Sequence, residues 1–377
     1  MPFNEAQSAA VGHKDGPMMV LAGPGSGKTT VVTHRVQSLI EKHGVNPSSI
    51  LVITFTRAAA REMKERFERL MEGRPMRGQV SFGTFHSVFF RILKLAYQYD
   101  ASDIIREDQK LRVIRELTAK EQLEPEDENE LISSLISEIS AVKGEQIDLE
   151  HYYAKSCSGD SFRRIYRGYE EQLQRAHKID FDDMLVMCWE LFRKRPDILS
   201  AWQKKYEYIL VDEFQDINRL QYQIVRMLAA PSDNLFIVGD DDQSIYRFRG
   251  AKPEIMLGFE RDYPKAARVL LDVNYRSTRE IVEASLRLIE HNEKRFKKSL
   301  KTAGSRGRGV ITRLWEDEEE ENSRIAEEIR MYAEAGCSYS DIAVLYRTNS
   351  GPKRLIEKLM EYNLPFRARD QVPNLYE

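Results

Sequence analysis

The chain has 377 residues, of which 42% are hydrophobic and 31% charged, and its formal net charge is −3. This length suggests two or three domains, and the composition excludes a disordered protein and a uniformly basic protein that coats DNA. Its three cysteines are scattered without a CxxC pair, and no histidines stand at metal-ligand spacing, which argues against zinc and disulfides. We see neither a signal peptide nor an apolar run of about 20 residues, so we expect a cytoplasmic protein without membrane contact.

Short apolar runs alternate with helical patterns through most of the chain. The runs are rich in β-branched residues, and each predicts a strand: residues 17–22, 50–55, 208–214, 235–240 and 268–273. Helical patterns follow the first two runs, at residues 28–44 and 56–73. Strands that alternate with helices in this way predict an α/β fold with a parallel sheet.

Residues 89–200 interrupt this alternation. The stretches QKLRVIRELTAKEQL and ELISSLISEISAVKG carry a helical period, and β-runs are absent. We therefore expect residues 1–88 and 201–273 to form one sheet domain in two parts, with residues 89–200 as a helical insertion.

Residues 274–377 are predicted to begin a second α/β domain. The basic stretch KRFKKSLKTAGSRGRG (294–309) has the composition of a flexible loop. Beyond it, GVITRLWE, IAVLYRTN and LPFRAR are predicted strands that are separated by two helices. Because this gives too few strands for a full sheet, we expect only the first part of that domain.

The stretch AGPGSGKTT follows a predicted strand and opens a predicted helix, which is the setting of a phosphate-binding P-loop. Backbone N–H groups of the turn and the positive end of the helix would hold phosphate oxygens. Lys28 would reach the β- and γ-phosphates, and the Thr29 hydroxyl would bind Mg²⁺. Ala22 replaces the glycine of the strict pattern, a position that tolerates a small residue. The predicted phosphate-binding residues are Ala22, Gly23, Pro24, Gly25, Ser26, Gly27, Lys28, Thr29 and Thr30.

A second set of candidate catalytic residues lies in VDEFQD (211–216), at the end of another predicted strand. Ligands of open parallel sheets gather at the carboxyl ends of strands, so these acids should face the P-loop. Asp212 would hold Mg²⁺, and Glu213 would orient and deprotonate the attacking water. Acids are also favoured at the start of a following helix, which accounts for Asp216 but not for the pair at 212–213.

Nine motifs in one order make the chain recognisable. They are FNEAQ (3–7), AGPGSGKTT (22–30), TFTRAAAREM (54–63), GTFHS (83–87), IDFDDML (179–185), DEFQD (212–216), GDDDQSIYRFRGA (239–251), NYRST (274–278) and VLYRTN (344–349). Together they resemble the UvrD/PcrA/Rep family of superfamily 1A DNA helicases across essentially the whole chain. The resemblance implies a RecA-like ATPase domain with a helical insertion, followed by the first part of a second RecA-like motor domain.

The resemblance also implies the residues of the ATP site. It makes Gln7 the reader of the adenine and Gln243 a sensor of the γ-phosphate. It makes Arg276 an arginine-finger-like residue and leaves Tyr275 available to stack on the adenine. Without the family, Arg276 is equally well interpreted as a surface arginine.

On the DNA side, the resemblance implies a single-strand path lined by Phe55, Thr56 and His86, with Tyr246 and Phe248 as stacking platforms. Phe55 alone would be interpreted as a core residue, because it ends an apolar strand. Arg247 and Arg249 are open between phosphate contacts and ion pairs of the core. Many relatives carry tryptophan where this chain has Phe248, so we expect stacking to persist with a weaker grip. Asparagine is common where Arg57 stands, which adds a charge near the path.

The implied function is the ATPase region of a 3′–5′ DNA helicase or single-stranded DNA translocase in DNA repair or replication. ATP and Mg²⁺ would be its cofactors, and single-stranded or 3′-tailed duplex DNA the partner of a monomer. One alternative is the motor subunit of a helicase–nuclease; another is a nucleotide- or DNA-binding module without unwinding activity, although Lys28, Glu213 and Gln243 are all retained. RNA as substrate stays open. The family's remaining motifs are absent, including a second arginine of the ATP cleft, so we expect this chain to hydrolyse ATP poorly on its own.

Overall fold

The computed structural model describes residues 2–74, 78–123, 127–246, 250–348 and 351–368. Its chain divides into two compact units, Met1–Arg308 and Gly309–Glu377. Within the described ranges, no helix is long and apolar enough to cross a membrane.

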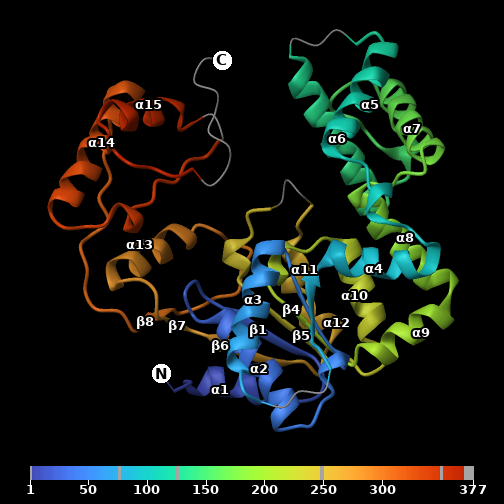
Figure 1. Ribbon diagram of the computed structural model, residues 1–377, viewed down its shortest axis with the longest axis horizontal. Coiled ribbons are helices and arrows are strands. Elements are labelled where there is room, and N and C mark those ends of the chain that lie inside the picture. Colours follow the sequence, from blue (N-terminus) through green and yellow to red (C-terminus); the bar gives the residue numbers. More distant parts are fainter. Residues whose placement is uncertain (1, 75–77, 124–126, 247–249, 349–350, 369–377) are drawn as a thin grey trace. The chain divides into compact units, whose positions relative to one another are not determined.

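A parallel sheet forms the centre of the first unit (Figure 1). It has six strands in the order β3-β2-β4-β5-β1-β6. The strands are β1 (Met18–Ala22), β2 (Ile50–Thr54), β3 (Ser81–Thr84), β4 (Tyr208–Val211), β5 (Leu235–Gly239) and β6 (Ala267–Leu271). The sheet confirms the predicted α/β fold. Strand β3 was not predicted, because its four residues, SFGT, include a glycine and too few apolar side chains to give a β-period.

Alternating side chains of the strands bury both faces of the sheet. On β1, Met19 and Leu21 belong to one core and Met18 and Val20 to the other. The first core is closed by side chains of helices α4, α8, α9 and α10, and the second by helices α1, α2 and α3. Since both faces are covered, the functional groups of the sheet must gather at its strand ends.

Fifteen α-helices lie within the described residues. They are α1 (Glu5–Gly12), α2 (Lys28–Glu41), α3 (Arg57–Leu70), α4 (Phe85–Tyr97), α5 (Glu107–Lys120), α6 (Glu128–Glu145), α7 (Gly159–Arg175), α8 (Phe181–Lys194), α9 (Pro196–Lys205), α10 (Arg219–Ala229), α11 (Pro253–Leu257), α12 (Phe259–Asp262), α13 (Arg279–Ile289), α14 (Glu318–Glu334) and α15 (Lys353–Glu361).

The inserted helices form a core of their own. Apolar side chains of α5, α6 and α7 make up this core, which spans Ile105 to Leu173. Helices α4 and α8, at the two ends of the predicted insertion, instead pack in the core of the sheet. Because these two helices belong to the sheet core although they overlap the predicted insertion, the packing does not establish the boundaries at residues 89 and 200, which stay a prediction.

The basic stretch 294–309 differs from the flexible loop that its composition predicted. Residues Lys301–Thr302 form strand β8, which pairs with β7 (Val273–Asn274), and Lys298 is buried. Residues 295–300 have no regular secondary structure, as a loop would, but Arg295 and Lys298 pair with Asp242 and Asp240, which the composition did not indicate.

Within residues 309–348 and 351–368, the structure has helices α14 and α15 but no strand. The strands predicted from GVITRLWE, IAVLYRTN and LPFRAR are wrong for these described residues. A strand needs a neighbouring strand to pair with its backbone, and here apolar side chains such as Leu314 and Leu345 stay exposed. The core of this unit is small and is formed by Ala326, Leu355, Leu359 and Leu364.

Candidate nucleotide site

The P-loop connects β1 to α2 as the sequence predicted. Gly25 and Gly27 have φ angles of +65° and +87°, which only glycine adopts without strain. The Ser26 hydroxyl donates a hydrogen bond of 2.7 Å to the Gly23 carbonyl oxygen, which holds the turn closed. Helix α2 begins at Lys28, so its positive end faces the loop.

A single polar pocket joins the P-loop to the loops that follow strands β4 and β5. It is lined by Pro24, Gly25, Ser26, Gly27, Lys28, Thr29, Thr30, Glu62, Arg66, Glu213, Gln243, Tyr275 and Arg276. Most of the predicted ATP-site residues therefore surround one space. Glu62 and Arg66 of α3 were missed, because their pattern is that of an exposed helical ion pair, four residues apart.

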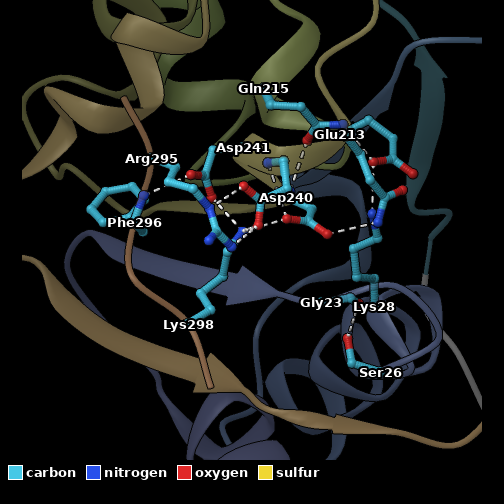
Figure 2. A network of polar contacts seen from close by, with 12 residues as sticks. Gly23, Ser26, Lys28, Glu213, Gln215, Asp240, Asp241, Arg295, Phe296 and Lys298 are labelled. Atoms are coloured by element: carbon cyan, nitrogen blue, oxygen red, sulfur yellow. Dashed lines mark hydrogen bonds and ion pairs between the residues drawn. The ribbon is translucent and has the colours of Figure 1, made fainter. Parts of the chain in front are cut away.

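Opposite the P-loop, two acids follow strand β4. The Lys28 ammonium lies 2.9 Å from a carboxylate oxygen of Glu213 (Figure 2). Asp212 is buried, and its Oδ1 atom has no hydrogen-bond partner. Burial first, and the Glu213 carboxylate second, raise the pKa of Asp212 to about 7. The buried carboxylate oxygen of Asp212 that has no partner is a hard oxygen donor, which fits Mg²⁺.

Gln215, which the sequence did not single out, connects the two acidic loops. Its amide nitrogen donates to Glu213 at 3.0 Å, and its amide oxygen accepts from the backbone N–H of Asp240 at 3.0 Å. A Cβ atom on Gly239 would lie 2.6 Å from that amide oxygen, so a larger residue there would displace the Gln215 amide. The signal in the sequence was a glutamine two residues after Glu213, a position from which a buried amide can bridge two loops.

Gln243 lines the pocket at the end of a short 3-10 turn that follows β5. Its side-chain amide donates a hydrogen bond of 2.7 Å to Asp240, whose side chain is fully buried. The amide is therefore held at the rim of the pocket by a carboxylate.

The NYRST motif is attached to the P-loop by hydrogen bonds. Asn274 donates to the carbonyl oxygen of Pro24 at 2.7 Å, and the backbone N–H of Tyr275 donates to Gly25 at 3.0 Å. These bonds bring Arg276 to the pocket and leave the Tyr275 ring partly exposed.

Gln7 lies behind the P-loop and does not line the pocket. Its amide nitrogen donates to the Ser26 carbonyl oxygen at 3.1 Å, and its amide oxygen accepts from the backbone N–H of Asn4 at 3.2 Å. In this structure Gln7 supports the P-loop backbone, and its reading of adenine stays a prediction.

The residues predicted to contact DNA lie at the ends of β2 and β3 and after β5. The rings of Phe55 and Tyr246 contact each other, with centroids 5.1 Å apart and planes inclined by 30°. Thr56 is exposed and caps α3, accepting a hydrogen bond from Ala59. The ring of His86 contacts Phe181, and burial lowers the pKa of His86. Phe248, Arg247 and Arg249 lie outside the described residues.

The raised pKa of Asp212 predicts a pH-dependent effect of Asp212→Asn. The folded protein holds this proton to higher pH than the unfolded chain, so the free energy of unfolding falls between the ordinary pKa of 3.8 and about 7. Without Mg²⁺, the variant should therefore gain stability relative to the parent as pH rises, on the order of 1–4 kcal/mol between about pH 5 and pH 8. Urea unfolding of both proteins at the two pH values measures this change.

The change between the two pH values, not the absolute difference, is the readout, because a buried asparagine amide has a cost that pH does not alter. Burial also raises the pKa of Asp216 to about 6 and that of Asp183 to about 7, but both groups are present in the two proteins. A difference in stability that stays constant from pH 5 to 8 would contradict the assignment.

Comparison with known proteins gives matches along nearly the whole chain. Residues 3–264 match the family model described as UvrD/REP helicase N-terminal domain, and residues 269–375 match the UvrD-like helicase C-terminal domain. The chain is 38% identical over 378 residues to the YjcD protein of Bacillus subtilis, covering 99% of this chain and 50% of that protein. It is also 38% identical over 374 residues to the ATP-dependent DNA helicase PcrA of Staphylococcus epidermidis, covering 97% of this chain and 50% of that protein. The chain thus spans about half the length of the curated relatives it matches.

Proposed function

The chain belongs to the UvrD/REP helicase family, and from that premise we propose that it is the nucleotide-binding part of an ATP-driven motor on single-stranded DNA. The observation that carries the proposal is the pairing of Lys28 with Glu213 at 2.9 Å, across a pocket that Gln243 and Arg276 also line. An ion pair that served only stability would not require a P-loop, the Gln243 amide and the Arg276 guanidinium around the same pocket.

The proposed chemistry assigns one role to each residue. The P-loop backbone and Lys28 bind the β- and γ-phosphates, and Gln243 and Arg276 stabilise the charge on the transferred phosphoryl group. Glu213 orients a water molecule and accepts its proton. Thr29 and Asp212 would hold Mg²⁺, which when bound neutralises phosphate charge.

The proposed DNA contact starts from the aromatic pair. Gln243 and Tyr246 are three residues apart in one loop, and the ring of Tyr246 contacts Phe55 at the end of β2. Bases stack on aromatic rings whatever their sequence, so the two rings together offer a platform for a single strand. A loop that carries both a phosphate sensor and such a ring would link the state of the nucleotide to the grip on DNA.

This part of the proposal predicts that Phe55→Ala and Tyr246→Ala each weaken binding of single-stranded DNA. Loss of one stacking ring should cost ~1–3 kcal/mol, which is about 5- to 150-fold in affinity. Fluorescence anisotropy of a labelled oligothymidylate measures the affinity, with unlabelled DNA and RNA of equal length as competitors.

Tyr153→Ala is the matched control, since this ring is 91% exposed and lies on the helical insertion. It should bind DNA as the parent does. If Phe55→Ala and Tyr246→Ala also leave the affinity unchanged, the aromatic pair is not a DNA platform. A stronger competition by RNA than by DNA would change the assigned substrate.

A further inference from the structure

A segment that we call the strap, residues 295–304, contacts three loops of the nucleotide site. At its start, Arg295 and Lys298 pair with the acids of residues 240–242. In its middle, Leu300 packs on the P-loop so closely that a Cβ atom on Gly23 would lie 2.6 Å from its Cδ2 atom. At its end, the backbone N–H of Ala303 donates to the carbonyl oxygen of Asn274 at 2.9 Å.

The contact with residues 240–242 is a largely buried cluster of charged side chains (Figure 2). The Lys298 ammonium contacts Asp240, lies 2.6 Å from Asp241 and lies 2.9 Å from Asp242. Arg295 binds both carboxylate oxygens of Asp242 at 2.6 Å. These three carboxylates are close enough together to hold a metal ion. Lys298 already supplies the cation there, so we assign no metal to them.

Asp240 is the residue through which the cluster reaches the nucleotide pocket. One of its carboxylate oxygens accepts from Lys298, and the other accepts from the Gln243 amide at 2.7 Å. Its backbone N–H donates to Gln215, which in turn binds Glu213. Burial disfavours the charged ammonium of Lys298, but the carboxylates outweigh burial and raise its pKa, so the pair stays charged.

We propose that Lys298 is a positioning residue for Gln243, and so sets how strongly the pocket distinguishes a nucleoside triphosphate from a diphosphate. A buried carboxylate without a counter-ion would be protonated or would move toward water. Either change would remove the acceptor that orients the Gln243 amide. The inference rests on the proposed function, because it assumes that Gln243 contacts the γ-phosphate.

The test is Lys298→Met in the full chain, with binding of ADP and of a non-hydrolysable ATP analogue measured by calorimetry in Mg²⁺. We expect affinity for the analogue to fall about tenfold, the factor of one charge-assisted hydrogen bond, while affinity for ADP stays within about twofold. Lys297→Met is the matched control, because the neighbouring lysine is exposed. It should leave both affinities unchanged.

Two further variants separate positioning from a structural role. Lys298→Met with Asp241→Asn removes one positive and one negative charge, so it keeps the net charge of the cluster if Lys298→Met alone does not fold. It should show the same selective loss. Gln243→Ala should also lose the preference for the triphosphate, and adding Lys298→Met to it should cause no further loss, because both changes act through one contact.

The outcomes distinguish this inference from the proposed function. A parent protein that binds neither nucleotide overturns both. A parent that prefers the triphosphate, together with folded Lys298 variants that keep the preference, overturns the role of Lys298 alone. The role of Lys298 is also overturned if Lys298→Met lowers the affinity for the ATP analogue further in the Gln243→Ala protein. It is overturned as well if Lys298→Met lowers the affinities for ADP and the analogue equally.

Discussion

Lys28→Ala is expected to lower the affinity for Mg²⁺-ATP by about 10²-fold, because it removes the charge-assisted hydrogen bonds to the phosphates. It also removes the cation that lies 2.9 Å from Glu213. Lys28 opposes the rise in the pKa of Asp212, so in the variant this pKa should move further upward. Binding of Mg²⁺ at neutral pH should then weaken as well. Calorimetric titration with Mg²⁺-ATP measures both losses.

Lys42→Ala is the control for this variant, since Lys42 lies at the exposed opposite end of helix α2. It should bind nucleotide as the parent does. Thermal unfolding adds a second readout: without nucleotide, Lys28→Ala should be more destabilised at pH 8 than at pH 5, because the acids it leaves unpaired are charged at the higher pH. Unchanged affinity in a folded Lys28→Ala protein would mean that the P-loop is misassigned.

Patterns that depend on local chemistry were predicted well from the sequence. Apolar runs located five strands of the sheet, and the glycine-rich turn located the P-loop, because short-range geometry alone determines both. Lys28, Glu213 and Gln243 follow three different strands and line one pocket. This was predictable because the carboxyl ends of parallel strands meet at one edge of the sheet, where ligands bind.

What the sequence could not predict depends on partners that are distant in the chain. Lys298 lies in a stretch that has the composition of a loop, and only the fold brings it to Asp241, 57 positions earlier. Gln7 was assigned to adenine from its motif, whereas its hydrogen bond to Ser26 depends on how α1 packs behind the P-loop. The apolar runs near Leu314 and Leu345 have a β-composition, but composition does not supply the neighbouring strand that pairing requires.

Whereas Lys28→Ala is expected to weaken nucleotide binding, Glu213→Gln is expected to leave binding intact and to slow hydrolysis. Hydrolysis should fall by about 10²–10⁴-fold, the usual contribution of a general base, because an amide cannot accept the proton of the attacking water. Affinity for ATP should be kept or should increase, since Lys28 no longer pairs with a carboxylate and is free to contact phosphate. The pKa of Asp212 should also fall, because Glu213 is its second largest cause of elevation, which favours Mg²⁺ at neutral pH.

Single-turnover hydrolysis with the protein in excess over ATP measures the rate even when turnover is slow, and titration with the non-hydrolysable analogue measures the affinity. Glu207→Gln is the control, since this exposed residue lies at the other end of strand β4 and should leave both quantities unchanged. A purely structural ion pair between Lys28 and Glu213 would make both substitutions lower stability and affinity together. A catalytic pair predicts a different pattern: Lys28→Ala loses nucleotide binding, whereas Glu213→Gln keeps binding and loses hydrolysis. A Glu213→Gln protein that hydrolyses ATP like the parent would exclude Glu213 as the base.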